Sequence, residues 1–220
     1  MTPELQLPEW ALPSEPRESA LVDQAIRIPA AWWRDKVAGY GLPGTAPDQP
    51  RLTRADVWRH TDDVFTLLWH ALAWGAGRFL RQNAKRLETI AADVPHARSV
   101  LTEAAGLSRT DPAAAYTLLR PNGRNAIKHL GPSFFTKFLY FAGGGAEDHP
   151  CLILDRRVAT SLRTECGWTG LARTGPWSPD TYARYCAQLR DWASRHARAA
   201  DEVELTLFNG AGRPRLDLVA

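Results

Sequence analysis

From Thr53 onward, apolar residues recur every three or four positions along most of the chain, which is the spacing of amphipathic helices. One such stripe follows Thr61, a residue able to cap a helix, and is expected to end at Trp74-Gly75; its apolar members are Val64, Phe65, Leu68 and Leu72. The same reasoning predicts helices at about 78–92, 95–105, 112–119, 122–129, 132–142, 155–166, 178–199 and 201–208, the last of which could instead be a strand. Asp111 and Ser178, each followed by proline, mark two of the helix starts. No stretch alternates with period two, so the predicted fold class is all-α.

The first fifty residues differ from the rest because prolines interrupt them repeatedly. We therefore expect residues 1–52 to form an irregular, proline-rich N-terminal arm with two short helices, at about 17–27 and 30–38. This arm is expected to pack on a helical core of residues 53–220. Within that core we expect a helical hairpin at 122–142, followed by a loop at 143–155.

Length and composition exclude several classes of protein. The 220 residues, 45% hydrophobic and 23% charged, are ordinary for one or two soluble globular domains and exclude disorder. No apolar run approaches the roughly 18 residues that span a bilayer, and the first residues lack the pattern of a secretion signal. We therefore expect a cytoplasmic monomer with no membrane partner.

Cysteine and histidine spacing argues against a disulfide framework and against a metal centre. The three cysteines, Cys151, Cys166 and Cys186, include no CxxC pair, and the six histidines include no HExxH motif. Cys151 and Cys166 have no basic residue beside them in the sequence, so we interpret them as buried thiols.

Charge is distributed unevenly along the chain. The formal net charge is +3, but residues 120–163 contain seven Lys or Arg and only three acidic residues, a local net charge of +4. Such an excess is typical of a contact with an anion or a nucleic acid, although a solvated surface would give the same pattern.

The segment 125–162 contains the clearest candidate chemistry. Gly131 and Pro132 predict a sharp turn into a helix, whose unpaired N–H groups could bind phosphate. After that helix come three glycines at 143–145, and the apolar run 151–154 then leads to Asp155 at the start of the next helix. Asp155 is suited to cap this helix, and a carboxylate placed after four apolar residues could also be partly buried and catalytic.

This order of hairpin, apolar helix, glycine-rich loop and aspartate resembles the helix-hairpin-helix DNA glycosylases, especially the bacterial branch related to 8-oxoguanine glycosylases. The resemblance implies duplex DNA as the partner and no cofactor, with Asp155 stabilising the positively charged sugar as the base leaves. The lysine nucleophile of bifunctional members aligns with Ser133 or Phe134, which implies a monofunctional enzyme that uses water. Lys137, one turn later, would be the nucleophile if the hairpin were gapped differently; otherwise it contacts phosphate or is structural.

The resemblance also implies residues for binding DNA and for holding the base. The hairpin reads His129-Leu130-Gly131 where the family has Gly-x-Gly, so its turn is expected to differ in shape. Segment 72–78 falls where relatives fill the gap left by the extruded base, with small residues allowing close approach to the duplex.

Gln188 and Trp192, at i and i+4 of one helix, match a base pocket, although Trp192 could equally be core. A monovalent cation at the hairpin carbonyls is also implied. The expected DNA contacts are Lys128, His129, Gly131, Ser133, Arg156, Arg157 and Arg78.

The leading hypothesis is therefore a DNA glycosylase that flips out a modified base and leaves an abasic site. The base could be an oxidised purine, or a hypermodified cytosine of phage DNA in antiviral defence. A pocket enlarged by Trp32, Trp33 and the helix at 61–74 would suit the second class. The alternatives are a non-catalytic helix-hairpin-helix DNA-binding protein and a helical protein-interaction domain.

Overall fold

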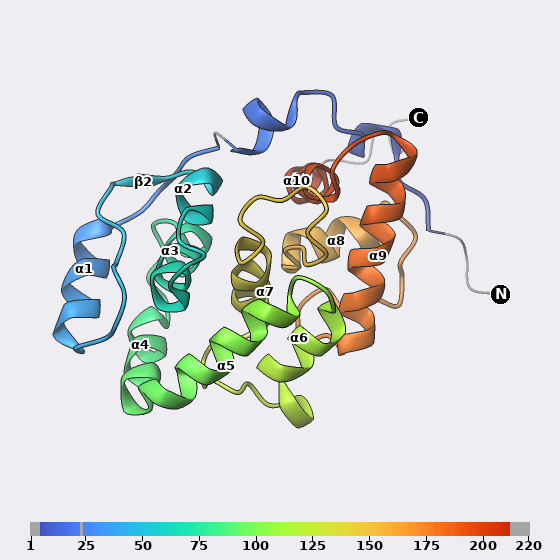
Figure 1. Ribbon diagram of the computed structural model, residues 1–220. Coiled ribbons are helices and arrows are strands. Elements are labelled where there is room, and N and C mark those ends of the chain that lie inside the picture. The colour runs from blue at the N-terminus through green and yellow to red at the C-terminus, as the bar shows by residue number, and fades with distance from the viewer. Residues whose placement is uncertain (1–4, 23, 212–220) are drawn as a thin grey trace.

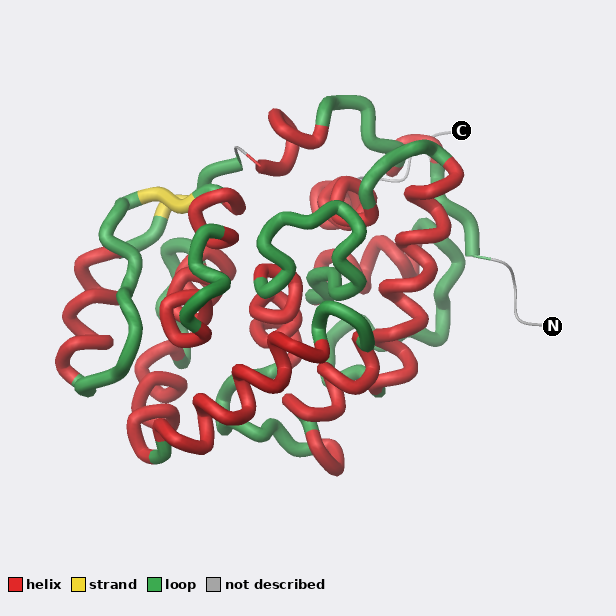
Figure 2. The backbone as a smooth tube through the Cα atoms, in the orientation of Figure 1, coloured by secondary structure: helices red, strands yellow, loops and turns green. Residues whose placement is uncertain are grey.

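Helices make up nearly all of the regular structure, as the all-α prediction requires (Figure 1; Figure 2). The computed structural model describes residues 5–22 and 24–211; the predicted domain ranges also include 1–4, 23 and 212–220, which lie outside the described residues. Within the described residues, the one sheet pairs two short antiparallel strands, β1 (Ile26–Arg27) and β2 (Arg51–Leu52). None of the described helices is long and apolar enough to cross a membrane.

The helices follow the sequence prediction in outline. They are η1 (Glu9–Ala11), η2 (Glu18–Val22), α1 (Ala30–Gly39), α2 (Arg54–Trp58), α3 (Val64–Ala76), α4 (Asn83–Ala92), α5 (Val94–Leu107), α6 (Pro112–Leu119), η3 (Pro121–Gly123), α7 (Pro132–Phe141), α8 (Arg156–Thr164), α9 (Pro179–Arg195) and α10 (Ala200–Gly210).

The helix α7 lies in the middle of the bundle (Figure 1). It packs against α3, α2, α5 and α6, while α9 and α8 pack against α10. Eight of its ten residues are buried, so α7 has almost no solvent-facing side, unlike a surface helix. Side chains on α7 therefore reach the interior, where they can build a water-poor site.

Helix starts are set by side chains that cap unpaired N–H groups, and several were predicted correctly. Asp111, Asp155 and Ser178 accept N–H groups at the starts of α6, α8 and α9. The cap expected at Thr61 is wrong: Asp63 caps α3, accepting the N–H of Phe65 and of residue 66.

Three predicted helices were wrong in place or extent, and backbone conformation explains two of them. The first hairpin helix, at 122–129, is absent; Asn122, Gly123 and His129 have φ of 51°, 76° and 68°, which a right-handed helix cannot accommodate. The helix at 78–92 begins only at 83, because Gln82 has φ of 62°. The helix at 17–27 shortens to η2, and residues 26–27 join the sheet instead. The last segment is a helix, α10, and not a strand.

The N-terminal arm is attached to the helical core by apolar and ionic contacts. Trp33 is fully buried within the same hydrophobic cluster as the helices. Arg17 donates from Nε and Nη2 to the two carboxylate oxygens of Asp201 at 3.0 and 2.7 Å, and from Nη2 to the carbonyl of Gly145. Asp201 is 4% exposed and also accepts the hydroxyl of Tyr140, so the arm neutralises a buried carboxylate of α10. The three cysteines are buried and free.

Candidate active site

Asp155 is delivered to its position by an extended segment, 151–154, that is completely buried. The hydroxyls of Tyr182 and Tyr185 on α9 donate to the carbonyls of residues 152 and 153 at 2.8 and 2.6 Å. Thr136 on α7 donates to the carbonyl of residue 154 and accepts its N–H. These contacts satisfy the polar groups of a buried, non-helical backbone and fix where α8 begins.

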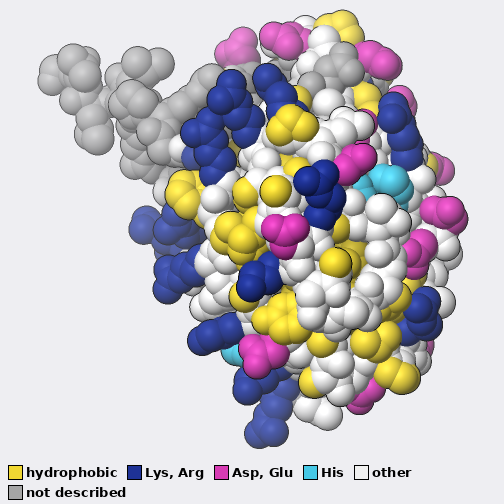
Figure 3. Space-filling model, turned by 90° about the vertical axis from the view of Figure 1, so that its left-hand side faces the viewer, with side chains coloured by type: hydrophobic (Ala, Val, Ile, Leu, Met, Phe, Trp, Pro, Cys, Tyr) yellow, Lys and Arg dark blue, Asp and Glu magenta, His cyan; other side chains and the backbone are white. Residues whose placement is uncertain are grey.

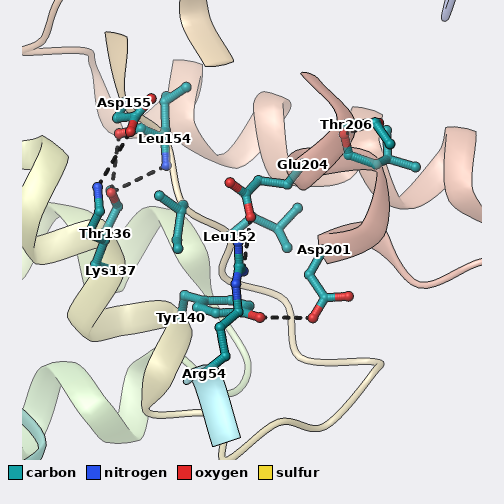
Figure 4. A network of polar contacts seen from close by, with 12 residues as sticks. Arg54, Thr136, Lys137, Tyr140, Leu152, Leu154, Asp155, Asp201, Glu204 and Thr206 are labelled. Atoms are coloured by element: carbon teal, nitrogen blue, oxygen red, sulfur yellow. Dashed lines mark hydrogen bonds and ion pairs between the residues drawn. The ribbon is translucent and has the colours of Figure 1, made fainter. Parts of the chain in front are cut away.

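The carboxylate of Asp155 makes two kinds of contact, of which Figure 4 shows the one with Lys137. Oδ1 accepts the N–H groups of residues 157 and 158 at 2.9 and 3.2 Å, which is the capping role expected from the sequence. Oδ2 lies 3.5 Å from Nζ of Lys137, and the two side chains are only 15% and 8% exposed. The ammonium group of Lys137 also donates to the carbonyl of Ser133 at 2.8 Å. The structure thus places the amine of Lys137 beside the carboxylate of Asp155, although the alignment on Gly131-Pro132 put the lysine of bifunctional members at Ser133 or Phe134.

A glycine on the neighbouring helix makes room for this lysine. A Cβ atom at Gly75 of α3 would lie 2.5 Å from Cδ and 3.0 Å from Cε of Lys137. The sequence had suggested that small residues in segment 72–78 allow close approach to a duplex. In the structure, glycine at position 75 serves another purpose: the Lys137 side chain occupies the space that a Cβ atom would fill.

A cavity of about 380 Å³ opens beside the Lys137–Asp155 pair. This volume is within the range of small-molecule sites. Its wall comes from both ends of the chain and from the middle: residues 24–27 of the arm, Arg54 of α2, residues 74–79 at the end of α3, Ile153, and residues 204, 205 and 208 of α10. A carboxylate and a lysine that line the same cavity can act on one bound group.

A second, deeper ion pair lies in the same cavity (Figure 4). Nη1 of Arg54 donates to Oε2 of Glu204 at 3.1 Å, and each residue is 1% exposed. The guanidinium of Arg54 also lies over the rings of Trp74 and Tyr140, 5.0 and 5.1 Å from their centroids. Burial raises the pKa of Glu204 to about 7; Arg54 opposes this rise, while Asp155 and Asp201 add to it.

The predicted turn at Gly131 is present, but its backbone conformation does not require glycine at that position. Gly131 has an ordinary φ of −85°, and a Cβ there would find its nearest atom 3.9 Å away, so the turn does not need glycine at this position. The left-handed residue is His129, which stands where the family has its first glycine. Lys128 is exposed, and Ser133, half-buried, offers its carbonyl to Lys137.

The hairpin does not fit a monovalent cation at the His129 carbonyl. That oxygen accepts Nε–H of Arg86 at 2.9 Å, and the guanidinium also contacts Asn83 and lies over the ring of Phe134. A metal cation at the same oxygen would face a like charge in a poorly hydrated place. Across the part of the chain that the structure describes, no cluster of His, Cys, Asp or Glu suits a metal ion either.

The arginines predicted to contact DNA lie on the surface. Arg156 is exposed, and Arg157, also exposed, donates Nε–H to the carbonyl of Phe208 and lies over its ring. Arg78 is exposed at the cavity rim, next to Phe79, whose side chain is 81% exposed. On the face drawn in Figure 3, Lys and Arg gather along one edge, whereas Asp and Glu lie mainly along the top and the opposite edge.

The structure does not bring the predicted base pocket to this cavity. Gln188 and Trp192 share α9, but neither lines the cavity, and Trp192 is 3% exposed within the core. Their i, i+4 spacing places them on one helix face, and at Trp192 that face packs inward. Trp32 and Trp33 likewise lie outside the cavity, packed edge to face against each other.

Among the lining residues that the sequence did not single out, three bear on the chemistry of the site: Arg54, Phe79 and Glu204. Arg54 and Glu204 are 150 positions apart, and no local pattern joins them. Phe79 stood inside a predicted helix as an ordinary apolar residue, and only its exposure beside the cavity distinguishes it.

An all-α bundle that holds an aspartate at a helix start, facing a lysine within a cavity, has the arrangement expected of a helical DNA glycosylase. Residues 19–208 match the family described as "Putative 8-oxoguanine DNA glycosylase OGG-like protein", and the chain belongs to this family. The family supports a DNA glycosylase role and DNA as the substrate. Comparisons with curated proteins and with solved structures gave no match.

Proposed function

We propose that the protein flips an oxidised purine out of duplex DNA and breaks its N-glycosidic bond at Lys137 and Asp155. The observation that carries the proposal is the 3.5 Å contact between these two side chains at the cavity. The family's description supports an oxidised purine as the base. A hypermodified cytosine in antiviral defence has less support, because Trp32 and Trp33 lie outside the cavity and only the end of the helix at 61–74, at Trp74, lines it.

In the proposed reaction, Lys137 is the nucleophile. Once its ammonium has lost a proton, Nζ forms a bond to C1′ of the sugar while the base leaves with the electron pair of the broken bond and takes up a proton. The negative charge of Asp155 stabilises the positive charge that develops on the sugar, and it is most effective where water is excluded. The C1′–O4′ bond then breaks, O4′ takes up a proton and Nζ loses one, which opens the sugar ring and gives an imine. Hydrolysis of this imine returns the amine and leaves an abasic site. The earlier expectation of a water-dependent, monofunctional enzyme stays as the alternative course at the same site.

Base release tests the proposal directly. Duplexes that contain one 8-oxoguanine should yield the free base by mass spectrometry, with an abasic site revealed by alkali. Sodium borohydride added during the reaction should trap a covalent protein–DNA adduct if Lys137 attacks. Tight binding without release from any modified DNA would favour the non-catalytic DNA-binding alternative instead.

We propose that Phe79 fills the space that the extruded base leaves in the duplex. Its side chain is 81% exposed at the cavity rim, whereas large apolar side chains are normally covered. An apolar wedge of this kind offsets the cost of unstacking the duplex.

Phe79→Ala should therefore lower the rate of release from duplex DNA by about 10-fold. Release from single-stranded DNA should change little; an equal loss on both would contradict the wedge role. Tyr40→Ala, at another exposed large aromatic residue, is the matched control.

The space at Gly75 gives a second prediction. Gly75→Ala should push the Lys137 side chain away from Asp155 and lower base release by about 10-fold or more, because small displacements of reacting groups are costly. Gly106→Ala is the control: it is also a glycine within a helix, but nothing lies within 4 Å of its added Cβ. Gly106→Ala should keep full activity and unfold at an equal or higher temperature. Full activity of Gly75→Ala would show that base release does not depend on the Lys137 side chain lying against residue 75.

A further inference from the structure

The floor of the cavity holds more polar groups than the reaction at Lys137 and Asp155 needs. Arg54, Glu204 and Trp74 all line it, and Arg54 and Glu204 are each 1% exposed. Burying a charged pair costs several kcal/mol of desolvation, and apolar residues of similar size often replace such pairs without loss of stability. This pair therefore calls for an explanation other than holding the fold together.

Two N–H donors in this floor have no hydrogen-bond partner among the described residues. They are Nε of Arg54 and Nε1 of Trp74, and both atoms are buried. A buried donor left unpaired destabilises a protein, so most buried polar groups have a hydrogen-bond partner. Both residues line the cavity beside the carboxylate of Glu204, so a small shift of either side chain would present its N–H to an acceptor bound there.

We propose that Arg54, Trp74 and Glu204 recognise the edge of the extruded base. Arg54 and Trp74 donate N–H groups to its carbonyl oxygens, and Glu204 accepts an N–H of its ring. This inference rests on the proposed function, because it concerns the base that Lys137 and Asp155 release.

The chemistry of an oxidised purine matches these three groups. Unmodified guanine presents N7 as an acceptor, which a carboxylate would repel. An 8-oxopurine instead carries a hydrogen on N7 and a new carbonyl oxygen at C8. Glu204 can accept the first, while Arg54 or Trp74 can donate to the second. A site that leaves polar groups unpaired with the wrong base discriminates strongly, often by 100-fold or more by this mechanism.

The charge of Glu204 makes the recognition depend on pH. The charged and titratable groups around it are Arg54 from α2, Tyr140 from α7, Asp155 at the start of α8, Tyr185 from α9 and Asp201 on α10. Burial raises the pKa of Glu204 to about 7, so the carboxylate gains a proton as pH falls below that value. A protonated Glu204 can donate to N7 of guanine. The preference for 8-oxoguanine over guanine should therefore be smaller at pH 6 than at pH 8, and because this preference is a ratio, effects common to both substrates cancel.

The test compares release of the nucleobase with imine formation on an abasic duplex, which contains no nucleobase at the reacting sugar. Glu204→Gln and Trp74→Phe should each lower single-turnover release of 8-oxoguanine by about 10- to 100-fold more than they lower borohydride trapping on a preformed abasic duplex. Trp33→Phe is the matched control, since its Nε1 is also buried and unpaired but lies outside the cavity. It should leave the ratio of release to trapping unchanged.

The outcomes separate this inference from the proposed function. Equal losses of release and trapping in both variants would mean that the residues only support the fold, and unchanged release would mean that the base does not contact them. Trp74→Phe keeps the ring under Arg54, so it tests the idea even if Glu204→Gln unfolds. If the wild-type protein traps abasic DNA but releases no oxidised purine, the recognition role and the proposed base are both wrong, and only imine formation at Lys137 stands. If it does neither, both proposals fail.

Discussion

Replacing Asp155 by asparagine is expected to reduce base release by at least about 10²–10³-fold while binding of the duplex is retained. The substitution removes the negative charge that lies 3.5 Å from Lys137 and that would stabilise the sugar cation. Asparagine is as good a helix cap as aspartate, so α8 should still begin at the same residue. Single-turnover release, measured together with affinity for uncleaved duplex, checks both parts of the expectation.

Asp111→Asn is the control for the capping role of this carboxylate. Asp111 caps α6 by accepting the N–H of residue 114, but it lies outside the cavity. Its substitution should leave base release within a factor of two of the wild-type rate, since exposed caps contribute mainly to helix stability. Normal release by Asp155→Asn would mean that the reaction takes place somewhere else in the molecule.

Replacing Lys137 by glutamine should abolish borohydride trapping and lower base release by about 10³-fold or more, because an amide cannot form an imine. Glutamine retains a donor for the carbonyl of Ser133, which limits the damage to the helix. Mass spectrometry of the trapped wild-type adduct should place the DNA on Lys137. If Lys137→Gln still releases the base, water is the nucleophile, as the alignment of the hairpin had implied.

The matched control is Lys128→Gln, on the exposed side of the same hairpin. An exposed lysine that contacts phosphate contributes to affinity and to its salt dependence. Its loss should reduce the slope of log affinity against log salt by about 0.9. Trapping at saturating protein should be unchanged. A large loss of trapping in Lys128→Gln would indicate that general weakening of DNA binding explains both results.

Local signals explain which parts of the fold could be predicted. Asp111, Asp155 and Ser178 cap helices within three residues of themselves, so their roles could be inferred from adjacent sequence. The missing helix at 122–129 shows the limit of this reasoning. Asn122, Gly123 and Asn125 are poor helix formers, so local propensity already opposed this helix. Asn122 and His129 take left-handed conformations that a right-handed helix cannot include.

Some residues of the candidate active site could likewise be predicted from local sequence, and others could not. Asp155 could be proposed from its place after an apolar run, whereas its contact with Lys137 depends on how the segment 151–154 crosses α7. The pair of Arg54 and Glu204 joins α2 to α10 across 150 positions, a contact that one sequence does not encode locally. Trp192 illustrates the opposite error, because helical spacing gives a shared face without saying whether that face meets a cavity or the core.

The part played by α10 in the cavity has a consequence for synthesis of the protein. Residues 204, 205 and 208 form one wall, and they are translated after every other lining residue. A nascent chain that has already made α7 and α8 holds Lys137 and Asp155, but it lacks this wall and the carboxylate that pairs with Arg54. Products of premature termination before α10 should therefore have no complete pocket, and Arg54 would be left without the carboxylate that balances its buried charge.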